Sequence, residues 1–163
     1  MNWIFWYAYA LSTPQKDSLV VKDWNKQFDE VNNWLTSKGY IVRSYTDAED
    51  CVCFNGKTVF INSRNHPETR YYTLLHECGH VLIAQDSANF EREMPMYARS
   101  DDGRNARSKA YRVSTVAEEF EAWKRGRRLA MRLNHAVNDV KYDKQITENV
   151  MSYIEWAADG GGA

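Results

Sequence analysis

One segment of the chain reads Tyr71-Tyr72-Thr73-Leu74-Leu75-His76-Glu77-Cys78-Gly79-His80-Val81-Leu82-Ile83-Ala84. Because apolar residues occur around its whole circumference, the pattern predicts a helix that lies inside a protein. The helix is expected to begin near Pro67 or Glu68, since proline is favoured in the first turn. His66 is then a neighbour of the helix N-terminus.

Three residues of this segment carry chemistry. His76 and His80 are four positions apart, which places both imidazoles on one face of a helix. Two neutral imidazoles at this spacing can take two positions around one zinc ion, Zn²⁺. Glu77 can accept a proton from a zinc-activated water without filling a metal position. This is the HExxH arrangement of zinc metalloproteases, with Glu77 as the catalytic base.

A catalytic zinc site also needs a third protein ligand and one open position. The downstream candidates are Glu118, Glu119 and Glu121 on the next expected helix, and His135. Their spacing leaves all four open. Any glutamate that is not a ligand is expected on a solvated helix face.

The segments before the active-site helix predict a helix followed by a sheet. Apolar residues at helical spacing follow Ser18, and Gly39 is expected to end that helix. Strands are expected over residues 40–45, 51–54 and 58–62. Asn55-Gly56 is a hairpin signal between the last two strands. We therefore expect an α+β fold, in which a small antiparallel sheet packs on the active-site helix and its last strand borders a substrate cleft.

The segments after the active-site helix predict a loop and two further helices. Residues 86–113 are polar and poor in periodic signal, which is typical of a long loop. Helix is expected to return with Ser114 as its N-cap, and Gly126 marks a close contact within it. A last helix is expected over residues 143–158. Together these elements predict a single domain over residues 1–163, whose last four residues form a flexible tail.

Composition narrows the class of protein. The chain is 44% hydrophobic and 26% charged with a formal net charge of −1, as in ordinary globular proteins. It has three cysteines, and Cys51 and Cys53 are too close for a relaxed mutual disulfide. A secreted disulfide framework is therefore excluded, and a reducing, cytoplasmic compartment is expected. The apolar residues 3–11 lack a basic leader and are too short to span a bilayer, so we expect a buried strand and no membrane contact.

Three stretches of this sequence resemble a known family: Thr58-Val59-Phe60-Ile61-Asn62, the segment from Tyr72 to Leu82, and Glu119-Phe120-Glu121-Ala122. Over about residues 58–123 the chain is similar to the ImmA/IrrE family of intracellular zinc peptidases, and more broadly to the gluzincins. The resemblance implies a zincin-like fold. It also implies a third zinc ligand within a Glu-x-x-Ala-Asp/Asn pattern on the helix that follows the active-site helix.

Alignment of Ala122 with the family alanine makes Glu119 the third ligand, ahead of Glu118 and then Glu121. The family Asp or Asn falls on Trp123, which cannot accept a hydrogen bond from a ligand imidazole. Another residue is therefore expected to orient the metal-binding histidines.

Other side chains have weaker functional interpretations. Tyr97, Tyr111 and Tyr153 are candidates to stabilise an oxyanion, although a core or surface role is commoner for each. Cys78 is expected to point away from the metal and to pack in the core. From Arg104 to Arg132 the net charge is +6. The basic residues within 124–132 predict either a solvated face or a nucleic-acid contact.

These observations favour a zinc metalloendopeptidase that cleaves a specific intracellular protein. One alternative is a zincin-fold regulatory module that binds nucleic acid or protein with little proteolytic activity. This alternative fits the local positive charge, and the resembled family acts on DNA-bound repressors. A zinc-stabilised structural protein is a third interpretation.

Overall fold

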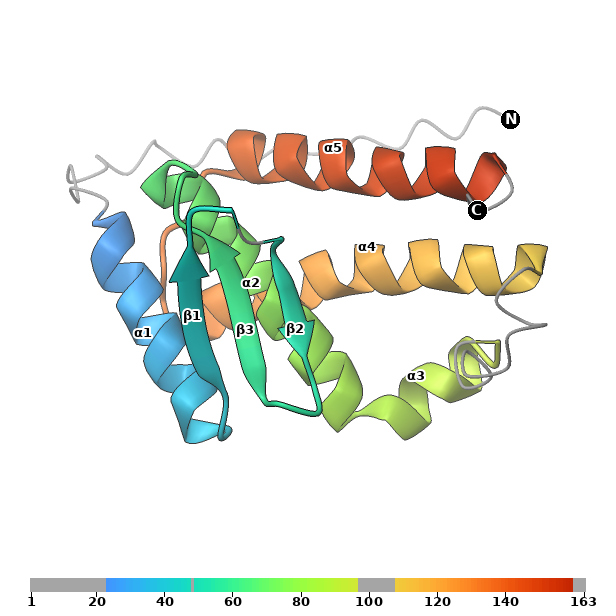
Figure 1. Ribbon diagram of the computed structural model, residues 1–163, viewed down its shortest axis with the longest axis horizontal. Coiled ribbons are helices and arrows are strands. Elements are labelled where there is room, and N and C mark those ends of the chain that lie inside the picture. Colours follow the sequence, from blue (N-terminus) through green and yellow to red (C-terminus); the bar gives the residue numbers. More distant parts are fainter. Residues whose placement is uncertain (1–22, 48, 97–107, 160–163) are drawn as a thin grey trace, which may run out of the picture.

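The computed structural model describes residues 23–47, 49–96 and 108–159. Within them the elements follow in the order α1 (Trp24–Ser37), β1 (Ile41–Tyr45), β2 (Cys51–Cys53), β3 (Thr58–Asn62), α2 (Pro67–Gln85), α3 (Ser87–Glu93), α4 (Lys109–Arg132) and α5 (Asp139–Ala158). The expected α+β class is thus confirmed. Helix α2 packs against the sheet, α1 and α4, and α5 packs against α4 (Figure 1).

Side chains cap the N-termini of the first two helices. The carboxylate of Asp23 accepts a hydrogen bond of 3.0 Å from the backbone N–H of Lys26, so it is the N-cap of α1. Gly39 follows this helix with φ +83°, a backbone conformation that favours glycine. Before α2, Nδ1 of His66 accepts a hydrogen bond of 3.3 Å from the N–H of Glu68. His66, predicted only as a neighbour of the helix N-terminus, is therefore its N-cap.

The sheet has the order β1-β3-β2 and is mixed. Strands β2 and β3 form the antiparallel hairpin predicted from Asn55-Gly56. Strand β1, however, pairs with β3 in parallel, with Ile41 opposite Thr58, so the prediction of an antiparallel sheet is wrong for this pair. The chain crosses one end of the sheet after β1, runs back as β2 at the far edge, and returns as β3 in the middle. Strands β1 and β3 consequently point the same way (Figure 1).

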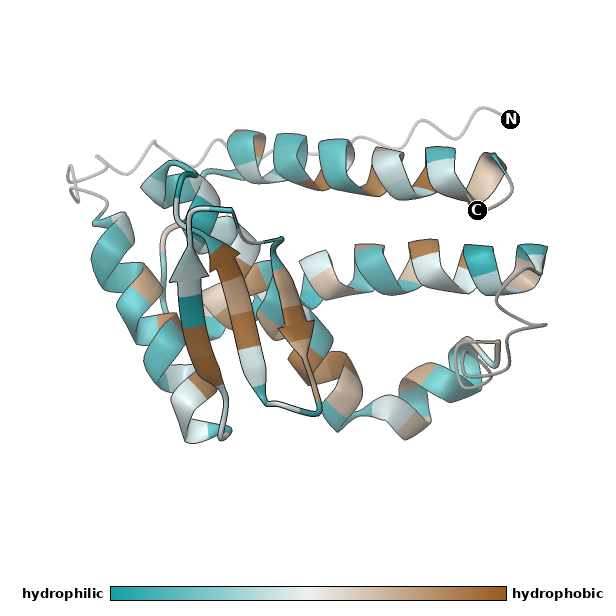
Figure 2. Cartoon of the chain, in the orientation of Figure 1, coloured by the Kyte–Doolittle hydropathy of each residue, from teal (hydrophilic) through white to brown (hydrophobic). Residues whose placement is uncertain are grey.

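The buried face of the sheet meets α2. Val59 and Ile61 alternate along β3 and are fully buried in the main apolar cluster, which also contains Leu74, Leu75 and Leu129. The hydropathy colouring of Figure 2 shows the apolar character of β3 against more polar outer helices. The most buried strand therefore lies at the centre of the sheet, against the helix that carries both histidines.

Helices α2 and α4 cross so closely that only glycine fits at two positions. A Cβ atom at Gly79 would lie 1.9 Å from the backbone O of Ala122, and one at Gly126 would lie 2.3 Å from the backbone O of Leu75. The close contact predicted at Gly126 is confirmed. The two backbones touch, which holds α4 in one register along α2.

One helix was not expected from the sequence, and two others begin earlier than expected. Helix α3 lies within residues 86–113, where a loop was expected. Helix α4 begins at Lys109, because the hydroxyl of Ser108 accepts a hydrogen bond of 3.1 Å from Tyr111 N–H; Ser114 is buried inside the helix. Helix α5 begins at Asp139 rather than near residue 143.

Some expectations lie outside the described residues, namely the strand at 3–11, Tyr97 and the tail after residue 159. In the part of the chain that the structure describes, no helix has the length and hydropathy needed to cross a membrane. All three cysteines are free thiols.

Candidate metal centre

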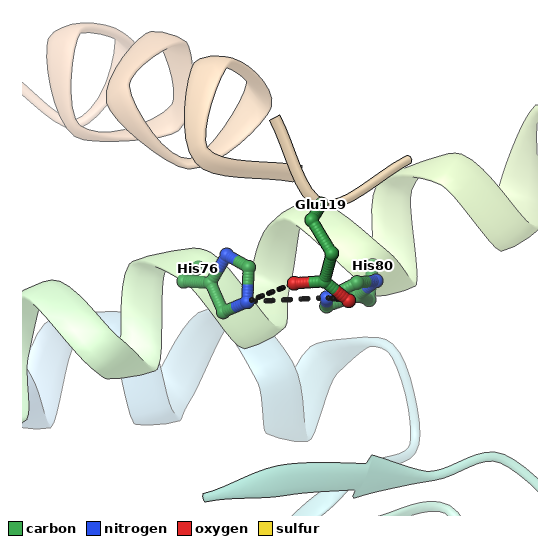
Figure 3. Close-up of side chains that lie close together, drawn as sticks. All are labelled: His76, His80 and Glu119. Carbon is green, nitrogen blue, oxygen red and sulfur yellow. Dashed lines mark hydrogen bonds and ion pairs between the residues drawn. The ribbon is translucent and has the colours of Figure 1, made fainter. Parts of the chain in front are cut away.

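Side chains from α2 and α4 converge on one point. Nε2 of His76 lies 3.2 Å from Nε2 of His80. The carboxylate of Glu119 faces both rings, with Oε2 3.3 Å from His76 Nε2 and Oε1 3.7 Å from His80 Nε2 (Figure 3). Three potential ligand atoms from these residues all lie within 4.8 Å of one another. The structure thus brings together the three residues predicted as metal ligands.

The spacing of these atoms fits a small divalent cation. A tetrahedral zinc site with Zn–N distances of 2.0–2.1 Å has ligand atoms about 3.3 Å apart. The separations of 3.2, 3.3 and 3.7 Å match that edge. Moreover, Oε2 of Glu119 is buried and no described residue forms a hydrogen bond with it, so a cation would compensate its charge. The residues present therefore fit a bound zinc ion.

The crossing of α2 and α4 explains why Glu119 reaches the histidines. Ala122 touches Gly79, which lies between His76 and His80 on α2. Glu119 precedes Ala122 by three residues and so lies on the same face of α4. Its side chain, only 6% exposed, reaches the two imidazoles from the facing helix.

Glu118 contacts the second ring nitrogen of His80. Its Oε1 lies 2.6 Å from Nδ1 of His80. A carboxylate only accepts hydrogen bonds, so Nδ1 of His80 carries a proton and donates it, which leaves Nε2 directed at Glu119 and His76. Metal-binding histidines usually have such an acceptor on the second nitrogen. Glu118 therefore supplies one of the orienting partners that the sequence left unassigned.

A cleft of about 510 Å³ opens over these side chains. Its floor is the motif of α2, and Glu118, Glu119 and Trp123 of α4 line it as well. One wall is the stretch around β2, with Asp50, Cys51, Val52 and Phe54; the other is α5, with Gln145, Glu148, Asn149 and Tyr153. The strand beside the cleft is thus β2, and the expectation that the last strand would border it is wrong, because β3 occupies the middle of the sheet.

Comparison with known proteins agrees with this geometry. The model of a peptidase family, described as the IrrE N-terminal-like domain, matches residues 35–128, which is more than half of the chain. The chain belongs to this family. No curated protein and no solved structure matches the chain. The predicted resemblance is confirmed, and the match extends beyond residues 58–123 to include α1's end and β1.

Trp123 is the point at which this IrrE-like chain departs from the pattern that the resemblance implied. Its ring stacks on the ring of His76, with centroids 4.4 Å apart and planes 23° from parallel. Nδ1 of His76 is buried and has no hydrogen-bond partner among the described residues. His76 and His80 are therefore oriented by different means.

Burial and close pairing shift the pKa values of the three candidate ligands and of Glu77. Burial opposes the charge on His80, but hydrogen bonds to Glu118 and Glu119 outweigh it and raise its pKa to about 10. Burial also opposes the charge on Glu119, yet the two imidazoles that it faces lower its pKa to about 2. Burial raises the pKa of Glu77 to about 8 and lowers that of His76. Glu119 is consequently ionised at neutral pH.

The other candidate residues lie away from the converging ligands. Glu121 pairs with Lys124, Arg125 and Arg128 on α4. His135 hydrogen-bonds to Tyr71 and Glu30, on the side of α1. Neither lines the cleft. Their sequence spacing could not exclude them, because the facing direction of each depends on the register of α4.

Of the described tyrosine candidates, Tyr153 lines the cleft and Tyr111 does not. Burial raises the pKa of Tyr153, and the charge of the Glu119 carboxylate raises it further. Cys78 is fully buried in the apolar cluster, as predicted. Asp50, Asn149 and the rest of the cleft walls could not be predicted from the sequence, because no motif connects them to the histidines.

The basic residues within 124–132 are largely paired with acids. Lys124 and Arg125 contact Glu121, and Arg127 contacts Asp139 and Asp143 on α5. These ion pairs reduce the positive charge that the segment presents. A nucleic-acid contact here stays a prediction.

Proposed function

We propose that this protein is a zinc-dependent metalloendopeptidase that cleaves a specific intracellular protein. The observation that carries the proposal is the convergence of His76, His80 and Glu119 beneath an open cleft, with Glu77 beside them. Membership of a peptidase family supports it. Three free thiols are consistent with an intracellular setting.

In this proposal His76 and His80 hold zinc through Nε2, and Glu119 holds it through its carboxylate. A zinc ion at this position supplies a Lewis acid that lowers the pKa of water toward about 7 and polarises a peptide carbonyl. Glu118 keeps the Nε2 of His80 available by accepting a hydrogen bond from Nδ1–H. The carboxylate of Glu119 needs no change of protonation, because its pKa is about 2.

Glu77 is the proposed general base. Its Oε1 lies 4.0 Å from Nε2 of His76, so it adjoins the ligand atoms without being the nearest carboxylate to them. It accepts a proton from the attacking water as the new C–O bond forms at the scissile carbonyl. It then gives that proton to the amide nitrogen as the C–N bond breaks. The phenol of Tyr153 lies across the cleft and is proposed to stabilise the negative charge on the carbonyl oxygen.

The free edge of β2 is the proposed platform for the substrate. Among the described strands, β2 pairs with β3 alone, and its other edge borders the cleft. An extended polypeptide can add to such an edge by main-chain hydrogen bonds. This arrangement brings a scissile peptide bond over Glu77 and the histidines.

The test compares wild type with Glu77→Gln on a whole-proteome extract, with new N-termini read by mass spectrometry. We expect both proteins to carry about one zinc ion per chain, since Glu77 is not a ligand. Loss of the base is expected to lower cleavage by about 10²- to 10⁴-fold. Glu93→Gln, the same change on exposed α3, is the matched control and should cut like wild type. New N-termini produced equally by Glu77→Gln would show that the mechanism is wrong.

A further inference from the structure

A buried tryptophan ring packs against His76. Trp123 is 2% exposed, and its ring stacks on His76 at 4.4 Å between centroids. His80, four residues further along α2, meets the ring of His76 edge-on, at 80° and 4.7 Å. His76 is therefore enclosed on one face by Trp123 and bordered by His80.

The edge of His76 lacks the restraint that His80 has. Nδ1 of His80 lies 2.6 Å from Glu118, whereas Nδ1 of His76 is buried without a hydrogen-bond partner in the described part of the chain. A hydrogen bond at Nδ1 would normally fix the rotation of a metal-binding imidazole about its Cβ–Cγ bond. For His76 that rotation is instead limited by contact, because turning the ring would drive its edge into Trp123.

The position of Trp123 is fixed because two residues of α5 hydrogen-bond to it. Its Nε1–H donates a hydrogen bond of 2.8 Å to Oδ1 of Asn149. The hydroxyl of Tyr142 donates one of 3.0 Å to the backbone O of Trp123, and the Tyr142 ring packs edge-on against the indole at 5.3 Å. Asn149 also lines the cleft, so one amide side chain both fixes the indole and faces the proposed substrate.

We propose that Trp123, anchored by Asn149, is the positioning residue for His76, and that stacking replaces the hydrogen bond that usually orients a metal-binding histidine. The inference rests on the proposed metal site, but not on peptide cleavage. It makes α5 part of the metal centre, although α5 contributes no ligand. It also explains how a residue that cannot accept a hydrogen bond occupies the position where the resemblance implied Asp or Asn.

The test is a titration of metal-free protein with Co²⁺ and Zn²⁺, followed by visible absorption and competition with a chelator. Trp123→Leu removes the stacked ring and is expected to weaken binding by about 10- to 100-fold, the range for loss of an orienting partner. The Co²⁺ ligand-field bands should shift in energy, because the His76 ring then takes another orientation. Trp123→Phe keeps a ring but loses the bond to Asn149, and should fall between the two.

Trp34→Leu is the matched control, since Trp34 packs on the apolar core from α1, outside the cleft. It should keep both the affinity and the bands of wild type. A purely structural role for Trp123 would lower thermal stability without moving the bands of the protein that remains folded. If Trp123→Leu does not fold, Asn149→Leu decides, because it leaves the indole in place and removes only its anchor.

Wild-type affinity and unshifted bands in Trp123→Leu, or in Asn149→Leu where the first variant fails to fold, would overturn the proposal. Wild-type protein that binds neither metal would overturn it together with the proposed function. Wild-type protein that binds metal but cuts nothing in the proteome extract would remove the peptidase proposal alone.

Discussion

Oε1 of Glu118 lies 2.6 Å from Nδ1 of His80, on the side of the ring opposite Glu119. Two consecutive residues of α4 therefore approach the two nitrogens of a single imidazole. The nearer carboxylate accepts a hydrogen bond from Nδ1–H, and the other, 3.7 Å from Nε2, faces the ligand position. One turn of α4 thus supplies a candidate metal ligand, Glu119, and the carboxylate of Glu118, which orients the ring of His80.

Glu118→Ala should weaken zinc binding without abolishing it. The variant removes the acceptor at Nδ1 and leaves the three converging ligand atoms in place. The expected loss is about 10- to 100-fold in affinity, measured by competition with a chelator. Glu121→Ala removes a carboxylate from the same helix that pairs only with cations, so its affinity should equal that of wild type. Equal affinities for Glu118→Ala and wild type would refute the orienting role.

Glu119→Ala should lose metal altogether on dialysis. This carboxylate faces both imidazoles and has a buried oxygen without a hydrogen-bond partner within the described ranges. The loss should exceed the about 10- to 100-fold cost of removing an outer partner, because two histidines alone leave zinc one protein ligand short. Metal analysis of the dialysed variants measures this. Zinc retained by Glu119→Ala but lost from Glu118→Ala would reverse the two assignments.

The histidine pair was predictable because its geometry is local. Residues four apart on a helix share a face whatever else the protein does, so His76 and His80 needed only the helix. Glu118 and Glu119 are different, since consecutive helical residues point about 100° apart and only the register of α4 decides which one faces the histidines. Backbone contact at Gly79 and Gly126 sets that register. In the sequence these contacts are indicated only by single glycines within helices.

The difference between local and long-range contacts also explains why one strand pairing was predicted correctly and the other was not. The pairing of β2 with β3 follows from a short turn at Asn55-Gly56, and it was predicted. The pairing of β1 with β3 joins strands that are separated by another strand, so no local signal encodes it. The start of α4 was missed because the five residues 109–113 are too few to show a helical period. The cap at Ser108 and the tertiary burial of Arg112 and Ser114 decide it.

Gly79→Ala should destabilise the fold itself. The added methyl would lie 1.9 Å from the backbone O of Ala122, so α2 and α4 must move apart. Forced overpacking costs about 1–3 kcal/mol and occasionally more, and a backbone clash belongs at the upper end. Denaturant unfolding of metal-free protein measures the change. Gly56→Ala is the control, because its Cβ would meet Cys53 Sγ at an ordinary 3.5 Å. Equal stability of Gly79→Ala and wild type would contradict the close crossing.

Zinc affinity should rise with pH, and one residue accounts for the slope between about pH 8 and pH 10. In metal-free protein the pKa of His80 is raised to about 10, since hydrogen bonds to Glu118 and Glu119 outweigh the effect of burial. Metal at Nε2 must displace that proton, so binding is opposed below pH 10 and favoured as pH increases. Glu77 is already ionised above its pKa of about 8, and Glu119 is ionised throughout.

A single displaced proton corresponds to an increase in affinity of about tenfold per pH unit in this window. Chelator-buffered zinc titrations at several pH values measure the slope, and calorimetry in buffers of different ionisation enthalpy counts the proton directly. Glu118→Ala supplies the matched comparison. Without the hydrogen bond at Nδ1 the pKa of His80 falls, so the affinity of this variant should stop rising at a lower pH than that of wild type. An affinity that stays constant from pH 8 to pH 10 in wild type would show that His80 binds the metal without releasing a proton, and would exclude it as the titrating ligand.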